Sequence, residues 1–100
     1  PVVHDFHHHL FTHRGMSQAE ALSMACSTWG DVIPVVHYSE SRAEEHGNPK
    51  IKPQAHSDMI RNYIDTYGQE VHIMIEAKHK ELALLEYRNK YQNTQQLLAG

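Results

Sequence analysis

The stretch Val71-His72-Ile73-Met74-Ile75-Glu76-Ala77 decides the fold of this chain. Successive side chains of an extended strand point to opposite faces, so His72, Met74 and Glu76 share one face and the apolar residues between them share the other. We therefore predict a strand over residues 71–77 that buries one face and carries a carboxylate near its carboxyl end.

Two earlier apolar runs follow the same design. Residues 2–6 and 32–38 are short and β-branched, and both are predicted as strands. The first run includes Asp5, and the second includes His37. Pro34 lies inside the second run and, because it lacks a backbone N–H, it argues against a fully central place in a sheet. Each of the three predicted strands thus ends close to a side chain that binds metal ions.

Helical patterns separate the predicted strands. Ser17 and Glu20 form a Ser-x-x-Glu capping box at the start of an apolar stripe with helical spacing. Helices are predicted over residues 17–29, 55–66 and 79–97, and loops over residues 10–16 and 39–54. Strand followed by helix, three times over, is typical of an α/β fold with a parallel sheet and crossover helices.

The strand ends place several metal-binding side chains together. Active sites of parallel α/β folds lie at the carboxyl ends of the strands, where Asp5 with His8, His37 and Glu76 all fall. Imidazole combined with carboxylate suits zinc, manganese or iron better than calcium. The alternative is chance, because the chain has 10 histidines in 100 residues and several would lie near strand ends in any arrangement.

The other histidines receive individual interpretations. His56 opens the second helix after the long loop, and its position alone favours a solvated residue over a ligand. His7 and His9 are expected to be loop residues, with support of a neighbouring metal ligand as the alternative, and His72 is expected to be a core histidine. Phosphate contacts are one interpretation of three basic loop residues at the same end of the sheet, with solvated charges the equal alternative; these residues are Arg42, Lys50 and Lys52.

Length and composition set outer limits. One hundred residues make a single domain, residues 1–100, and a net charge of −3 gives no sign of the basic surface typical of nucleic-acid binding. Cys26 is the one cysteine, so no internal disulfide forms. The chain shows neither a membrane-spanning run nor a signal peptide, and we expect a cytoplasmic protein. It starts at Pro1 without a methionine, which suggests a processed product or a piece of a longer protein.

Five sequence blocks carry a family resemblance. They are Asp5-Phe6-His7-His8, Val36-His37-Tyr38-Ser39, Gln54-Ala55-His56-Ser57-Asp58, Met74-Ile75-Glu76-Ala77-Lys78 and Lys80-Glu81-Leu82-Ala83-Leu84-Leu85. Together they resemble the C-terminal part of UV damage endonucleases, over nearly the whole chain and in the expected order. The last two blocks, residues 74–78 and 80–85, are the most specific.

The resemblance implies a fold, an activity and a ligand set. The family is similar to endonuclease IV in having a TIM barrel with metals at its carboxyl face, so the chain would supply the last three βα units of a partial barrel. Family members are DNA repair enzymes that nick damaged double-stranded DNA 5′ to UV photoproducts, usually with manganese; zinc is a second possibility. The resemblance assigns metal binding to Asp5, His8, His37, His56 and Glu76.

Two departures from the family pattern shape the remaining expectations. Val35 stands where family members carry a lysine that is carboxylated to bridge metals, and the first five barrel strands are absent. We therefore expect the chain alone to be incomplete, with unpaired sheet edges that favour a homo-oligomer or require a missing N-terminal segment. A sugar isomerase or epimerase with a similar metal site, and a remnant without catalysis, are the alternatives.

Overall fold

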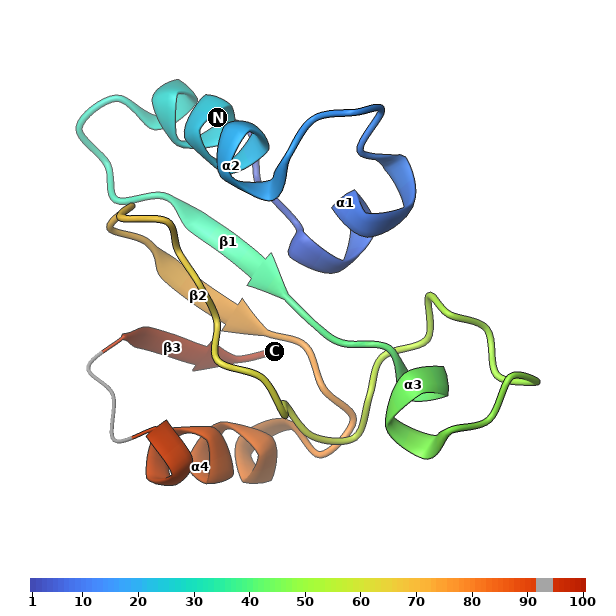
Figure 1. The fold of residues 1–100 in the computed structure, drawn as a ribbon. Coiled ribbons are helices and arrows are strands. Elements are labelled where there is room, and N and C mark those ends of the chain that lie inside the picture. The colour runs from blue at the N-terminus through green and yellow to red at the C-terminus, as the bar shows by residue number, and fades with distance from the viewer. Residues whose placement is uncertain (92–94) are drawn as a thin grey trace.

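A parallel sheet of three strands forms the centre of the computed structural model, which describes residues 1–91 and 95–100. The strands lie in the order β1 (Val35–Tyr38), β2 (His72–Ile75) and β3 (Gln96–Ala99), as Figure 1 shows. The predicted α/β class with a parallel sheet is confirmed. The two predicted strands that contain His37 and Met74 are neighbours in register, since these residues pair across β1 and β2.

Four α-helices accompany the sheet in the described part of the chain. They are α1 (Phe6–Thr12), α2 (Gln18–Cys26), α3 (Arg42–His46) and α4 (Lys80–Tyr91), and the 3-10 turn η1 (Ser27–Trp29) continues α2. The capping box at the start of α2 is present in full: Ser17 accepts from the N–H of Glu20, and the Glu20 carboxylate accepts from the N–H of Ser17. The prediction of this helix is confirmed.

The predicted strand over residues 2–6 is wrong. Residues 1–4 have no regular structure, and Asp5 makes one isolated parallel bridge to His37. The chain then turns into α1, where a loop had been expected from residue 10. The Asp5 carboxylate causes this turn, because its Oδ1 accepts the N–H of His8 at 2.9 Å and so caps the new helix.

The predicted helix over residues 55–66 is also wrong, because that segment has no helix. Two remote carboxylates occupy the backbone donors that a helix would use. Glu45 accepts from the N–H groups of Asp58 and Met59 at 2.7 and 3.0 Å. Glu40 accepts from the N–H groups of Arg61 and Asn62 at 2.9 and 3.0 Å. A charged acceptor makes a stronger hydrogen bond than a helical carbonyl, so the segment stays extended across the sheet.

The last predicted helix, over residues 79–97, ends too late. The helix α4 stops at Tyr91, residues 92–94 of the prediction lie outside the described residues, and the chain returns as β3. Leu97 lies in the buried core and pairs with Ile73, so the edge of β2 that had been expected to be open is covered. A helix through residue 97 would forgo this strand pairing.

One face of the sheet is packed and the other is not. The core residues of α2, the segment 60–71 and α4 share one hydrophobic cluster with Val36, Ile73 and Ile75, and Figure 1 shows that segment crossing the sheet between the helices. The alternate residues of the strands, such as Val35 and Met74, are half-buried on the opposite face. That face carries the candidate ligands.

Candidate metal centre

Three of the predicted ligands meet at one end of the sheet. Asp5, His37 and Glu76 each offer one ligand atom, and these atoms all lie within 4.8 Å of one another. Nδ1 of His37 is 3.3 Å from Oε1 of Glu76. All three residues are half-buried, so the group combines restricted motion with an opening to solvent. An imidazole and two carboxylates in this arrangement form a donor set suited to a divalent transition metal.

Backbone pairing produces this convergence. The N–H of His37 donates to the carbonyl of His4 at 2.9 Å, which places Asp5 beside the end of β1. The N–H of Glu76 donates to the carbonyl of Tyr38 at 2.9 Å, which continues the β1–β2 ladder past its last paired residues. The three side chains therefore come from adjacent parallel segments at their carboxyl ends, as parallel α/β folds place functional groups.

His56, a further predicted ligand, is not part of this three-residue group in the described part of the chain. It lines an open hollow of about 520 Å³ together with Glu76. Its backbone is fixed by an isolated bridge to Ser41 and by two flanking hydrogen bonds, from the N–H of Arg42 to Ala55 and from the N–H of Ser57 to Glu40, each 2.8 Å. A loop held this firmly gives the imidazole a defined place beside the Glu76 carboxylate.

The structure does not bring His8 into the three-residue group. Its side chain is exposed and lines a different hollow, of about 350 Å³, which it shares with Asp5, His9 and Thr12. The cause is local. The N–H of His8 donates to the Asp5 carboxylate that caps α1, so the His8 side chain projects from the first turn of this helix. In the described part of the chain, His8 adjoins one ligand and not the other two.

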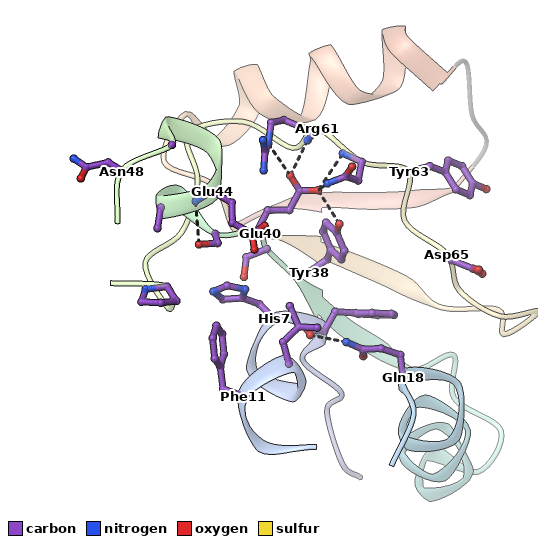
Figure 2. A pocket seen from close by; sticks show the side chains of 18 of the residues that line it. His7, Phe11, Gln18, Tyr38, Glu40, Glu44, Asn48, Arg61, Tyr63 and Asp65 are labelled. Atoms are coloured by element: carbon purple, nitrogen blue, oxygen red, sulfur yellow. Dashed lines mark hydrogen bonds and ion pairs between the residues drawn. The ribbon is translucent and has the colours of Figure 1, made fainter. Parts of the chain in front are cut away.

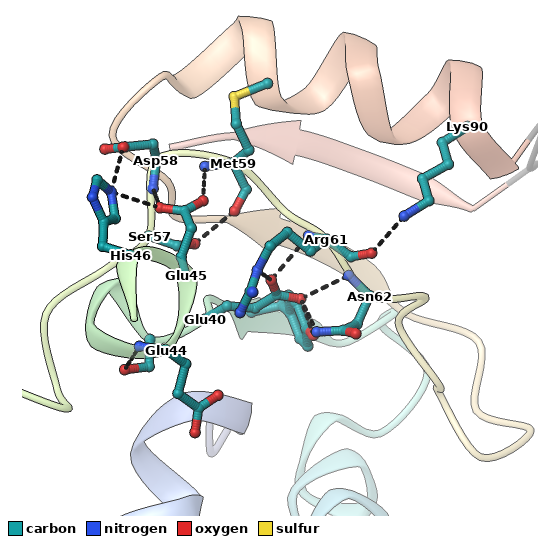
Figure 3. A network of polar contacts seen from close by, with 12 residues as sticks. Glu40, Glu44, Glu45, His46, Ser57, Asp58, Met59, Arg61, Asn62 and Lys90 are labelled. Carbon is teal, nitrogen blue, oxygen red and sulfur yellow. Dashed lines mark hydrogen bonds and ion pairs between the residues drawn. The ribbon is translucent and has the colours of Figure 1, made fainter. Parts of the chain in front are cut away.

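A second group of ligand-type residues lies between α3 and the segment that follows Ser57. Nε2 of His46 is 2.8 Å from Oδ2 of Asp58 and 3.3 Å from Oε1 of Glu45. These carboxylates already have partners, and Figure 3 shows Glu45 accepting from the backbone N–H groups of Asp58 and Met59. Asp58 also pairs with Arg42. The network fastens α3 to the neighbouring loop.

Electrostatic effects on ionisable groups follow from these contacts. The hydrogen bond with His46, helped by the charge of Arg42, holds the pKa of the Asp58 carboxyl below its ordinary value. Burial lowers the pKa of His4, whose Nε2–H donates to Oε1 of Gln18 at 2.8 Å. His4 therefore favours the neutral form and packs as a structural residue, although it precedes a candidate ligand.

The basic residues have different surroundings. Arg42 is paired with Asp58, while Lys50 and Lys52 are exposed in the loop after α3. Lys78 and Lys80 were missed at the sequence level, yet both line the hollow that holds His56 and Glu76. Their sequence position, directly after the carboxylate that ends β2, was the available signal.

The sequence comparisons identify the family. The family model described as UV-endonuclease UvdE matches residues 1–99. The chain belongs to this family. It is 33% identical over 91 residues to a protein of Halalkalibacterium halodurans named UV DNA damage endonuclease, and 33% identical over 96 residues to a protein of the same name from Bacillus mycoides. Each alignment covers 86% of this chain and 28% of the relative.

The UvdE family membership confirms the resemblance to UV damage endonucleases. The chain spans about 28% of the length of these curated relatives. No solved structure matches the chain. In the described part of this UvdE chain, no helix is long and apolar enough to cross a membrane.

Proposed function

We propose that the chain supplies part of the metal centre of an endonuclease that incises damaged double-stranded DNA 5′ to UV photoproducts. The observation that carries this proposal is the convergence of Asp5, His37 and Glu76 within 4.8 Å at the strand ends of a UvdE family member. His56, which adjoins Glu76, is the fourth protein ligand, and His8 is a fifth that needs a change of its side-chain direction.

The donor set fits a divalent manganese ion best, with zinc as the second choice. Two carboxylates and imidazole nitrogens suit both metals. The side chains of His37 and Glu76 are 37% and 30% exposed, which leaves room beside them for water and a phosphate group. When bound, such an ion lowers the pKa of a coordinated water and neutralises charge on the attacked phosphate.

The chain's own residues supply position and charge. Asp5 is fixed by its cap on α1, and Glu76 by the strand that carries it, so the two carboxylates hold one arrangement. Lys78 and Lys80 border the same hollow and offer ammonium groups to the DNA backbone. Lys50 and Lys52 are exposed in the loop after α3 and offer further ammonium groups, while Arg42 is paired with Asp58.

We further propose that the complete fold is a TIM barrel and that the parallel strands of this chain form part of its sheet. The support is the alternation on β1 and β2, where one face packs under helices and the other is half-buried and carries the ligands. Asp5 also lies beside the end of β1 through its isolated parallel bridge to His37. Most of a barrel would come from chain outside these 100 residues.

Metal binding and nicking together test the proposed function. UV-irradiated and untreated plasmid are incubated with Mn²⁺ and the protein, and bound manganese is measured by elemental analysis. His37→Ala and Glu76→Gln should both lose metal and nicking of irradiated DNA, while Glu70→Gln, a change at an exposed carboxylate that precedes β2 and so lies at the opposite end of the strand from Glu76, should match the wild type. Unchanged metal content in both ligand variants would contradict the proposal.

A further inference from the structure

His7 is buried, although it belongs to a run of three histidines. It is 4% exposed in the first turn of α1, and its Nε2 lies 3.1 Å from the backbone carbonyl of Gln54. A carbonyl oxygen only accepts hydrogen bonds, so Nε2 carries the proton. The other ring nitrogen, Nδ1, is buried without a partner among the described residues.

The His7 ring also makes defined contacts with two other rings. It packs edge to face against His56, with ring centroids 5.9 Å apart, and against Phe11, with centroids 5.1 Å apart. Figure 2 shows the His7 ring beside the Phe11 ring, and both residues line the cavity drawn there. Phe11 follows His7 by one helical turn, so the imidazole is held from its own helix as well as from the loop.

The loop that carries His56 is therefore fastened from two directions. The segment after β1 holds it through the backbone bonds of Ala55 and Ser57, both 2.8 Å long. His7 holds it from α1, through Gln54 and through the His56 ring itself. Asp5 is the N-cap of α1, and His7 lies in the first turn of that helix. This turn therefore connects a carboxylate of the candidate metal group with the loop that carries His56.

We propose that His7 is a positioning residue that sets the place and ring orientation of His56 at the metal centre. The inference rests on the proposed function, in which His56 is a ligand. His7 touches neither metal nor substrate; it acts by donating Nε2–H to the loop and by packing against the ligand ring. Groups that orient metal ligands in this way typically affect metal affinity by about 10–100-fold.

The first test is a double-mutant cycle on Mn²⁺ affinity. Free Mn²⁺ is followed by electron paramagnetic resonance in titrations of the full chain and of His7→Phe, His7→Gln, His56→Ala and His7→Phe with His56→Ala. We expect His7→Phe to weaken binding at least about tenfold. His7→Gln should recover most of that loss, because its amide reaches the Gln54 carbonyl. In the His56→Ala background, His7→Phe should have no further effect, since coupled residues are not additive.

The outcomes separate the two proposals. If His56→Ala leaves the affinity unchanged, His56 is not a ligand and both the ligand set and this inference fail. If His56→Ala weakens binding but His7→Phe does not, only the inference on His7 is overturned. A loss from His7→Phe that is equally large in the His56→Ala background would also overturn it, because His7 would then act through the fold in general.

A second measurement needs no metal. Nitrogen-15 spectra of the His7 side chain should show a proton on Nε2, and the His56 ring signals should shift in His7→Phe more than in His13→Phe, a change at an exposed residue. A His7 ring protonated at Nδ1 alone, or His56 signals that respond equally to both variants, would overturn the proposal.

Discussion

The Glu40 carboxylate accepts the backbone N–H of Arg61 at 2.9 Å, across 21 residues of sequence. The same carboxylate accepts from the N–H and side chain of Asn62 and from the hydroxyl of Tyr38, and it is 6% exposed. Burial, reinforced by the Glu40 charge, raises the pKa of Tyr38 and keeps its phenol a donor. This buried acceptor holds the segment after Ser57 flat across the sheet.

Glu40→Gln should therefore destabilise the fold. The amide replaces one acceptor oxygen by a donor that faces backbone N–H groups. We expect the free energy of unfolding to fall by about 2 kcal/mol, the range for a buried hydrogen bond to a charged group. Urea unfolding followed by circular dichroism measures this, with Glu44→Gln as the matched control, because Glu44 is exposed on the neighbouring helix. Equal stability of the two variants would show that the Glu40 network contributes nothing net.

Local patterns predicted the elements whose signal lies within their own residues. Alternation located β2 and its buried face, and the capping box located the start of α2. Apolar runs that end on ligands also predicted that Asp5, His37 and Glu76 would lie at one end of the sheet, where the structure brings them together.

Long-range contacts explain what the sequence did not reveal. Ile60 and Ile64 have helical spacing, yet remote carboxylates take the backbone donors of that segment and the two side chains are buried from an extended chain. Likewise, nothing in three consecutive histidines indicates that His7 is buried while His8 is exposed. The difference arises because consecutive side chains of a helix with about 3.6 residues per turn point in different directions, so His7 faces the loop at Gln54 while His8 faces solvent.

The Asp58 network should make stability depend on pH. The pKa of Asp58 is lower in the folded chain than its ordinary value of 3.8, because of the hydrogen bond with His46. A depressed pKa contributes stability that is present above the unfolded value and lost as pH falls through the folded one. Asp58→Asn should thus lower the unfolding midpoint at pH 7 and have less effect at pH 3. Urea titrations at both pH values check this, and an Asn effect that is larger at pH 3 would contradict it.

The face of the sheet that carries the candidate ligands is unusually open for a parallel sheet. Leu98 is 47% exposed and Val3 is 45% exposed there, whereas parallel sheets are normally covered on both faces. Residues 1–100 expressed alone should therefore self-associate. Light scattering should give a mass above 11.5 kDa that falls towards this value in Leu98→Asp.

Leu85→Asp is the matched control for self-association, because Leu85 is exposed on the outer helix α4. Its mass should equal that of the wild type. A wild-type monomer would mean that the open face needs no cover, and a mass that falls equally in both variants would mean that exposed leucines in general drive association.

The lysines beside His56 and Glu76 should contribute more to DNA binding than those of the long loop. Lys78 and Lys80 line the hollow that the two candidate ligands share, so a phosphate group near the metal centre lies within their range. Lys50 and Lys52 form the natural comparison, since they are equally charged and exposed.

Each lysine–phosphate contact contributes roughly 0.9 to the slope of log affinity against log salt concentration. Changing Lys78 and Lys80 to alanine should thus reduce the slope by about 2 and weaken binding at low salt. Fluorescence anisotropy with a UV-irradiated duplex over a range of salt concentrations measures this for both alanine pairs. A larger loss from the Lys50 and Lys52 pair would place the DNA backbone along the loop after α3 instead of over the hollow.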